Sequence, residues 1–600
     1  MRHSPEARRA SPGLGWLAWL ALLVLPAATA AVLGPPDRVR IEIDGVDRPM
    51  ADNVRAYLSL TRYVQRTDLT DGQVRRLADR AVDEAADALR PFGYYDPQVR
   101  SRTTRDDDRW IVRLRIKPGE PVLMRDVQVD IVGEGRTDPD IEQVLRSTPL
   151  RPGTRLDHAA YEKLKTDLVR TAVARGYLDA KLTHRALAVD PAQHAADARL
   201  ALDTGGRYEF GKVTIEQDAI DPAFLQGFVR FAEGQPYSAD RLRNTQFALE
   251  DSYYFSTVTV TPGERDPATL TVPVTIHAER IKRDRYTASV GYGTDTGPRG
   301  QFSWDRRLVN TSGHRFRLDS TVSSVLQEAV ARYIVPVGDP TIEKLMFSGG
   351  YTSEELGGLT SERWELVGSL TQAFGNWQRV LFLKLNQETT VFPSGPDERA
   401  LLLIPGISFS SMQPNFVTGF VRDAAYYFEL SGSPATLGSD ASYLRFYARA
   451  ERVWRFGESP WYLRLRGQLG TSWVDDFSEL PASQRFFAGG DNSVRGFALD
   501  SLSPKDPNAP PGSGNTGIGG EHMVAGTVQF ERDLPRNLVG VAFYDTGNAF
   551  DDWGTSLEYS VGVGIRYRLP MLMLGFDVAQ ALSEPDKSPR LHLSITQVLR

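Results

Sequence analysis

The chain has no cysteine among its 600 residues, and after residue 30 it has no apolar run long enough for a membrane-spanning helix. Without thiols there is no disulfide framework, so stability must come from packing or from a closed sheet. Any membrane insertion would have to use strands. Lys+Arg number 70 and Asp+Glu number 76, and the resulting net charge of -6 gives no indication of a nucleic acid partner.

The chain also lacks the motifs of the common enzyme classes. It has no Gly-x-Ser-x-Gly elbow, Walker loop or His-Glu-x-x-His pair, and its histidines are scattered singly. The text GYGTDTG at 291–297 lacks the spacing of a phosphate-binding loop. Asp475 and Asp476, and the acidic run at 106–108, are interpreted as solvated loop charges. We therefore expect no enzyme activity, no cofactor and no metal.

The first thirty residues have the form of a secretory signal peptide. Arg2, Arg8 and Arg9 precede the apolar stretch LGWLAWLALLVLPA, and Ala28 and Ala30 are the small residues that signal peptidase requires. We expect residues 1–30 to be a signal peptide cleaved after Ala30. Ordinary secretion is favoured over twin-arginine export because the rest of that pattern is missing.

The chain before residue 282 contains one unit three times. The segments LRPFGYYDPQV (89–99), AVARGYLDAKL (172–182) and ALEDSYYFSTV (248–258) each close a helical run and open a strand. Each lies within the order strand, helices, strand, strand, which is a small α+β module of about 80 residues. We expect modules at 31–118, 119–205 and 206–281, with the repeated tyrosines packing in their cores.

Beyond Arg283 the hydrophobic pattern has period two. In WYLRLRGQLGTSW (461–473), Leu463 and Leu465 point to one face, and Arg464 and Arg466 point to the other. A soluble sandwich would bury the apolar face, whereas a transmembrane barrel turns it to lipid and the arginines to a wet lumen. Tryptophans at both ends of this strand favour the barrel. We expect about sixteen tilted strands within 282–600, an even number that closes an antiparallel barrel.

Together these features resemble the Omp85 superfamily, whose periplasmic modules are called POTRA domains. The resemblance rests on the signal peptide, the three modules, the barrel of about sixteen strands and the text SVRGF in a long loop late in the barrel. It covers essentially the whole mature chain. The module count, with RFFAGGDNSVRGF followed by SLSP, is most similar to the TamA family within it. BamA proteins have five modules and two-partner secretion transporters usually have two.

The resemblance implies that the loop at about 474–520 joins the eleventh and twelfth strands and folds into the lumen. Its motif consists of Val494, Arg495, Gly496 and Phe497, with Arg495 at the tip. A planar guanidinium can hold a carboxylate through two hydrogen bonds, which a lysine cannot do. The alternative is that Arg495 is an exposed loop arginine like many others.

Two carboxylates are candidate partners for Arg495 in the lumen. Asp545, in AFYDTGNAF on the thirteenth strand, is expected first, and Glu531, in VQFERDL on the twelfth strand, is expected second. By alternation Asp545 shares a face with Phe543 and Gly547. We expect Gly547 to leave room for the incoming loop.

In this superfamily the barrel closes between its first and last strands, here about 285–293 and 591–599. Glycines weaken strand pairing, so this seam is expected to open more readily than the rest of the sheet. A client strand would then satisfy the exposed backbone groups by strand addition, without ATP or a cofactor. The residues assigned to the seam are Gly291, Gly293, His592, Ser594 and Thr596.

The expected function is therefore assembly of β-barrel or autotransporter-type clients in the bacterial outer membrane, with the modules in the periplasm. The resemblance implies a TamB-like partner that spans the periplasm and docks at the first module, between Val39 and Pro118. Two alternatives stay open. One is a polypeptide-secretion pore of the two-partner type, and the other is a role in lipid traffic to the outer membrane.

Overall fold

The structure is a computed structural model. It describes residues 39–597 except 65, 67–68, 107–108, 394, 412–423, 458, 511–515, 570–571 and 585. The predicted signal peptide and residues 31–38 lie outside the described residues. The chain forms two compact units: one of Met1–Glu209, Pro236–Ala239 and Asp266–Thr271, and one of Phe210–Gln235, Asp240–Arg265 and Val272–Arg600. No helix in the described part has the length and hydropathy needed to cross a membrane.

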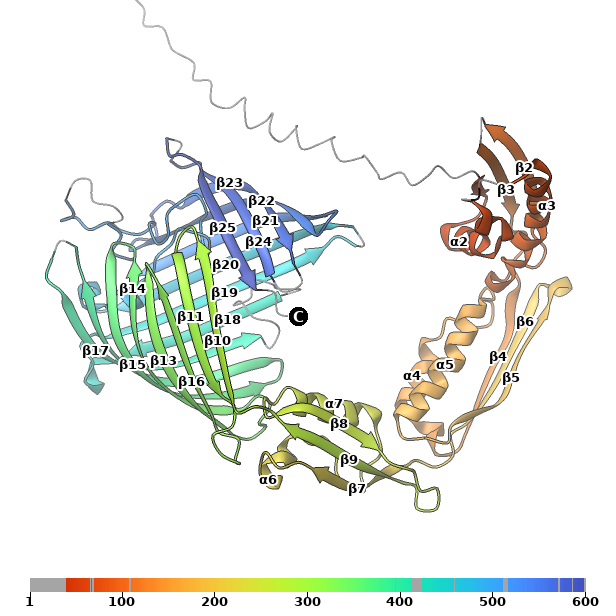
Figure 1. Cartoon of the computed structure of the whole chain (residues 1–600), viewed down its shortest axis with the longest axis horizontal. Coiled ribbons are helices and arrows are strands. Elements are labelled where there is room, and N and C mark those ends of the chain that lie inside the picture. The colour runs from red at the N-terminus through yellow and green to blue at the C-terminus, as the bar shows by residue number, and fades with distance from the viewer. Residues whose placement is uncertain are drawn as a thin grey trace, which may run out of the picture. The chain divides into compact units, whose positions relative to one another are not determined.

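The first compact unit contains two modules of one topology (Figure 1). In each, a mixed sheet has its last strand in the middle, parallel to the first strand and antiparallel to the second. The first module comprises β1 Val39–Asp44, α2 Arg48–Tyr57, η1 Ser59–Tyr63, α3 Asp71–Asp87, η2 Arg90–Phe92, β2 Gln98–Asp106 and β3 Arg109–Lys117. The second comprises β4 Leu123–Val132, η3 Glu134–Thr137, α4 Pro139–Ser147, α5 His158–Ala174, β5 Lys181–Asp190, η4 Pro191–Gln193 and β6 Ala195–Asp203.

Local sequence explains the helices of these modules. The Asp157 side chain caps α5 by accepting from the backbone N–H of Ala159 at 2.8 Å. Leu164 and Leu168, one turn apart, are buried against the sheet. The helix gives way to a turn in which Gly176 has φ +100°, a conformation that favours glycine. Each module therefore has its own core between its helices and one face of its sheet.

The third module repeats this order, but most of it belongs to the second compact unit together with the barrel. The Tyr254 hydroxyl donates to the carbonyl oxygen of Gly313 at 2.6 Å, and Arg230 forms an ion pair with Asp339 at 3.0 Å. These contacts fix the module to turns between barrel strands. Its elements are β7 Glu209–Glu216, α6 Pro222–Leu225, η5 Gln226–Phe228, α7 Ala239–Glu250, β8 Phe255–Pro262 and β9 Thr271–Arg280.

The rest of the chain forms one sheet of 16 antiparallel strands, in sequence order from β10 to β25 (Figure 1). The prediction of a barrel after three α+β modules is confirmed, and the soluble sandwich is wrong. The strands are β10 Asp284–Gly293, β11 Gly297–Arg306, β12 Arg315–Ser323, β13 Leu326–Pro336, β14 Lys344–Leu356, β15 Leu359–Phe374, β16 Trp377–Val391, β17 Glu398–Ser411, β18 Ala424–Ser433, β19 Tyr443–Arg455, β20 Trp461–Val474, β21 His522–Leu534, β22 Leu538–Phe550, β23 Glu558–Arg568, β24 Leu572–Ala581 and β25 Arg590–Gln597.

The two faces of the barrel follow the period-two pattern. On β20, Trp461 and Trp473 are 43% and 58% exposed on the outer face. Arg464 points inward and forms an ion pair with Glu531 at 2.6 Å. An apolar outside and a charged, paired inside are what a strand requires when it separates lipid from a polar lumen.

Candidate functional site

The long loop between β20 and β21 folds back on itself inside the second unit. Phe486 and Gly520 exchange backbone hydrogen bonds of 2.9 and 2.8 Å, and Ala488 and Leu502 exchange bonds of 3.0 and 2.8 Å. The loop therefore satisfies much of its own backbone. The ring of Phe486 in this loop packs against Gly470 of β20. A Cβ atom added to Gly470 would lie 2.3 Å from the ring.

A second arginine, which sequence reasoning missed, supports the stem of this loop. Arg485 is 6% exposed and donates from Nε to the carbonyl oxygen of Leu480 at 2.6 Å. Its Nη1 donates to the carbonyl oxygen of Ile518 at 3.1 Å, on the returning side of the loop. The side chain thus ties the two sides of the stem together. Neither acceptor is a side chain, so no residue type in the sequence indicates this role.

At the tip of the loop, Arg495 makes the bidentate contact expected of it. Its Nε and Nη2 donate to the two carboxylate oxygens of Asp545 at 2.7 and 2.9 Å. The backbone N–H of Arg495 also donates to Asp545, at 3.2 Å. The Arg495 side chain is 6% exposed and that of Asp545 is fully buried. Arg495 is therefore not an exposed loop arginine.

The remaining contacts of Arg495 involve residues that the sequence did not predict as its partners. Nη1 donates to Gln529 on β21 at 3.0 Å and to Asp577 on β24 at 3.4 Å. The guanidinium carbon also lies 3.3 Å from the ring centroid of Phe543, a cation–π contact. Asp577 in turn accepts from Arg566 Nη2 on β23 at 2.6 Å. One loop side chain thus joins three strands of the barrel wall, β21, β22 and β24.

Glu531, the second expected partner, does not bind Arg495. It accepts from Arg464 at 2.6 Å and from Gln529 Nε2 at 2.8 Å. Sheet register explains the difference, because Asp545 is paired with Thr527 rather than with Glu531. Glu531 lies four residues further along β21, or about 13 Å at the usual rise per residue. It therefore reaches Arg495 only through Gln529.

The nearest neighbours of Gly547 belong to the adjacent strand, so its expected role in making room for the loop stays a prediction. Gly547 shares the buried face of β22 with Asp545. However, a Cβ atom on Gly547 would first meet β21, 2.6 Å from the carbonyl oxygen of Val524, and not the loop. Within the motif, Gly496 has φ +100° and lies against β23 and β24, where a Cβ would be 3.0 Å from that of Ser560. The neighbouring Val494 and Phe497 are buried in an apolar cluster with Phe486.

The seam between β10 and β25 differs from every other junction of the sheet. The two strands lie side by side. Within the described residues, which end at Gln597 in β25, no ladder of backbone pairs joins them, whereas all other neighbours in the sheet are paired. The backbone N–H of Leu593 donates to the Thr294 hydroxyl at 3.3 Å. Gly291 and Gly293 lie in β10, paired on their other side with Arg299 and Gly297.

On β25, polar and apolar residues alternate as predicted. Leu591 and Leu593 are 57% and 38% exposed on the outer face, and His592 is 3% exposed on the inner face. Ser594 is half-buried, and a Cβ atom on Gly575 of β24 would come within 2.3 Å of its hydroxyl. Thr596 is paired with Met573 of β24, but its side chain lies outside the described residues.

Comparison with known families is consistent with this architecture. Residues 423–597 match the model described as the Omp85 superfamily domain. Residues 40–118 match the model of POTRA domain TamA domain 1, and residues 208–279 match the POTRA model of a surface antigen variable number repeat. The match to the Omp85 superfamily domain includes the inward loop and the last strands. The two POTRA matches lie within the first and third expected modules.

Individual relatives are similar over different parts of the chain. The outer membrane protein assembly factor BamA of Nitratidesulfovibrio vulgaris is 32% identical over 132 residues, 20% of this chain, and the match spans only 16% of the length of that relative. A crystal structure of BamA from Haemophilus ducreyi lacking POTRA domains 1–3 has a TM-score of 0.62 at 16% identity. It covers 79% of this chain and 100% of that chain, and it shows the shared fold.

Proposed function

This chain combines POTRA domains with an Omp85 superfamily barrel domain, and from that premise we propose that it assembles outer-membrane proteins by opening the seam between β10 and β25. The clients are β-barrel or autotransporter-type proteins. The barrel lies in the bacterial outer membrane and the POTRA domains lie in the periplasm. The reaction needs no cofactor and no bond chemistry, only the exchange of strand pairing.

The unpaired seam carries this proposal. Backbone N–H and C=O groups that face lipid without a partner each cost several kcal/mol, so an open edge readily accepts another strand. The outer side chains of β10 suit lipid, with Val290 93% and Tyr286 65% exposed. An incoming client strand would pair with this edge and take up its unsatisfied backbone groups.

The filled lumen favours lateral insertion over a secretion pore. The motif residues Val494 and Phe497 are 0% and 1% exposed inside the barrel, and Arg495 is fixed to the wall by Asp545. Passage of a polypeptide through the lumen would require this buried ion pair to break and the whole loop to leave. Opening of the seam requires no such removal of the tip from the wall.

The match of residues 40–118 to the TamA type of first POTRA domain supports a finer assignment. We propose that the chain is a TamA-type subunit and that a TamB-like protein docks on the first POTRA domain. Strands β1 and β2 are the edges of that domain's sheet, and edges accept a partner strand. An alternative function is that the same chain and partner transport lipid to the outer membrane.

A cysteine pair across the seam tests the proposal directly, since the chain has no native cysteine. Thr294→Cys with Leu593→Cys uses the positions where the Thr294 hydroxyl of the first hairpin accepts from the backbone N–H of Leu593 on β25 at 3.3 Å. We expect oxidation to stop insertion of a client into membranes containing the protein, and reductant to restore it.

The matched control joins β25 to its paired neighbour. Phe576→Cys with Leu593→Cys links two positions that already face each other in the ladder, so this bond leaves the seam free. Client insertion should continue with the control bond closed. Unchanged insertion with the seam bond fully closed would refute lateral opening, and a lumen route would become the better explanation.

The partner assignment has a separate test. A photo-crosslinking residue at Arg102, exposed on the edge strand β2, should capture a TamB-like protein in intact cells. The same group at Arg170, exposed on helix α5 of the second module, is the control and should capture much less of it. Equal capture at the two positions would argue against docking on the first domain.

A further inference from the structure

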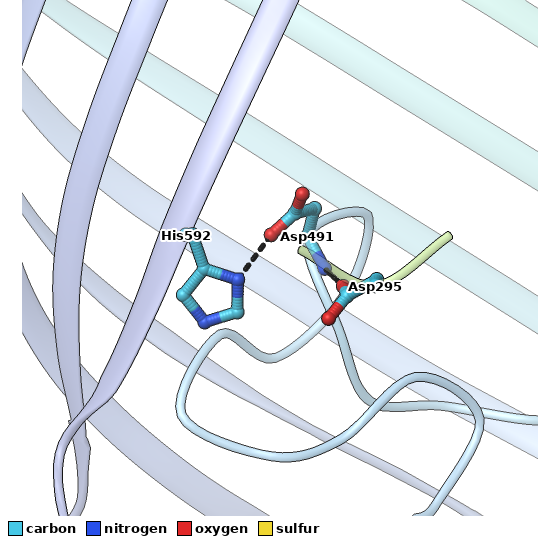
Figure 2. A group of neighbouring side chains, drawn as sticks. All are labelled: Asp295, Asp491 and His592. Atoms are coloured by element: carbon cyan, nitrogen blue, oxygen red, sulfur yellow. Dashed lines mark hydrogen bonds and ion pairs between the residues drawn. The ribbon is translucent and has the colours of Figure 1, made fainter. Parts of the chain in front are cut away.

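Three side chains meet on the lumen side of the seam, and each comes from a different part of the barrel (Figure 2). Asp295 lies in the turn between β10 and β11, Asp491 lies in the inward loop, and His592 lies on β25. One ligand-type atom of each lies within 4.8 Å of the others. The cluster therefore spans the one junction of the sheet where no ladder is seen in the described residues.

The loop contacts the last strand at two points. His592 Nδ1 is directed at Oδ1 of Asp491 and contacts it. On the other side of the ring, Nε2 accepts from the backbone N–H of Gly496 at 3.4 Å. Because Gly496 directly follows Arg495, the same short segment is fixed both to β25 and to the wall of the barrel.

The loop also contacts the first hairpin. The backbone N–H of Asp491 donates to Oδ2 of Asp295 at 3.1 Å, and the Asp295 side chain is only 6% exposed. Gly490 allows this approach, because a Cβ atom there would lie 2.9 Å from the same carboxylate oxygen, and its φ of +83° favours glycine. Arg590 of β25 lies 3.8 Å from the other oxygen of Asp295.

A metal site fits these atoms less well. A histidine that binds a metal through Nδ1 carries its proton on Nε2 and directs it to an acceptor. Here Nε2 faces the N–H of Gly496, which is itself a donor. The ring is therefore oriented to hold the loop, with Nε2 as acceptor and Nδ1 directed at Asp491.

We propose that Asp295, Asp491 and His592 form a clip through which the inward loop holds the two edges of the seam together. The clip connects β25 to the first hairpin through side-chain and loop contacts rather than through a backbone ladder. This proposal rests on the proposed function for its purpose, which is to regulate seam opening. The structural claim is that release of the loop loosens β10 and β25. This claim can be tested without a client protein.

The clip is suited to release as well as to closure. Burial, and next the negative charge of Asp491, raise the pKa of Asp295, so the closed arrangement holds its two carboxylates together against their repulsion. At the wall, Arg495 instead forms ion pairs with two carboxylates, Asp545 and Asp577. We therefore expect the loop to leave the seam while its tip stays on Asp545.

Hydrogen–deuterium exchange of the purified full-length protein in lipid nanodiscs tests the clip without any client. We expect Asp491→Asn, His592→Gln and Gly490→Ala each to raise amide exchange in β10 and β25 about tenfold. Peptides from the paired strands β15 and β16 should not change. The matched control is Asp506→Asn, a carboxylate of the same loop that accepts from the N–H of Asn508 and lies outside the cluster.

Unchanged exchange at the seam in all three variants would overturn the clip, as would an equal increase throughout the barrel. The same holds if a chelator applied to the unmodified protein raises seam exchange to the level of the variants, since a bound metal would then hold the seam. Client insertion is measured in parallel. Seam exchange that rises while insertion stays constant would leave the clip intact and count against the proposed function.

Discussion

The wall and the seam of this barrel hold the same loop by different means. On the wall, six adjacent strands from β19 to β24 are joined by ladders, and Arg495 is inserted into a network of opposite charges on them. At the seam, no ladder is seen in the described residues, and the loop itself joins the edges through Asp491. The comparison teaches that stability is concentrated where the barrel must stay closed and is sparse where it is proposed to open.

The largest effect is expected at the wall, from Arg495→Ala. This change leaves Asp545, which is fully buried, without its cation, at a cost of about 3–5 kcal/mol in the free energy of unfolding. Denaturant unfolding followed by the heat-modifiable mobility of the barrel measures the loss. Arg495→Lys should recover only part of it, since an ammonium cannot make the bidentate contact.

A double variant separates the ion pair from the fold of the loop. Arg495→Ala with Asp545→Asn removes both charges and should be more stable than Arg495→Ala alone. If the double variant is as unstable as the two single losses added together, the pair is not coupled and the wall contact has been misjudged.

A smaller effect is expected where the loop packs on β20. In Gly470→Ala, the added Cβ would collide with the ring of Phe486, at a cost of about 1–3 kcal/mol in stability. The matched control is Gly467→Ala on the same strand, where a Cβ meets nothing within 4 Å. Thermal unfolding of the two variants compares them, and equal melting temperatures would contradict the packing of the loop on this strand.

The loop should also respond to pH through Asp500. Burial, followed by the charges of Glu354 and Asp295, raises the pKa of Asp500 to about 7. The folded state therefore binds more protons than the unfolded state between pH 3.8 and about 7, so stability falls as pH rises through this window.

The expected change is about 1 kcal/mol, since the carboxyl is partly exposed and shares the window with other groups. Melting temperatures at pH 5, 6, 7 and 8 measure it. In Asp500→Asn the slope over this window should flatten, and a slope identical to that of the unmodified protein would assign the pH response to another group.

The smallest effect is expected at the seam, from Gly291→Ala. The new Cβ would meet only the flexible end of Arg299, and alanine reduces the conformational freedom that glycine gives to β10. We expect a gain of at most about 1 kcal/mol, slower amide exchange in β10 and slower client insertion. Faster exchange would show that glycine at this position strengthens the seam rather than weakens it.

Much of the architecture could be predicted because its signals are local. Alternation at 461–473 assigns Arg464 to the lumen and the tryptophans to lipid without reference to any other strand. The repeated helix-to-strand junctions likewise reveal the modules. The pairing of Arg495 with Asp545 was expected from the resemblance of two short motifs, and the structure brings them together.

The sequence by itself determined that about sixteen strands follow the three modules and which residues within a strand such as 461–473 face the lumen. Only the tertiary structure decided which lumen residues meet. Register placed Glu531 away from the tip and brought Asp577 to it, and closure of the barrel brought Asp491 to Asp295, 196 positions apart. The physical reason is that side-chain direction depends on local alternation, whereas contact across a barrel depends on register and closure, which no short stretch of sequence records.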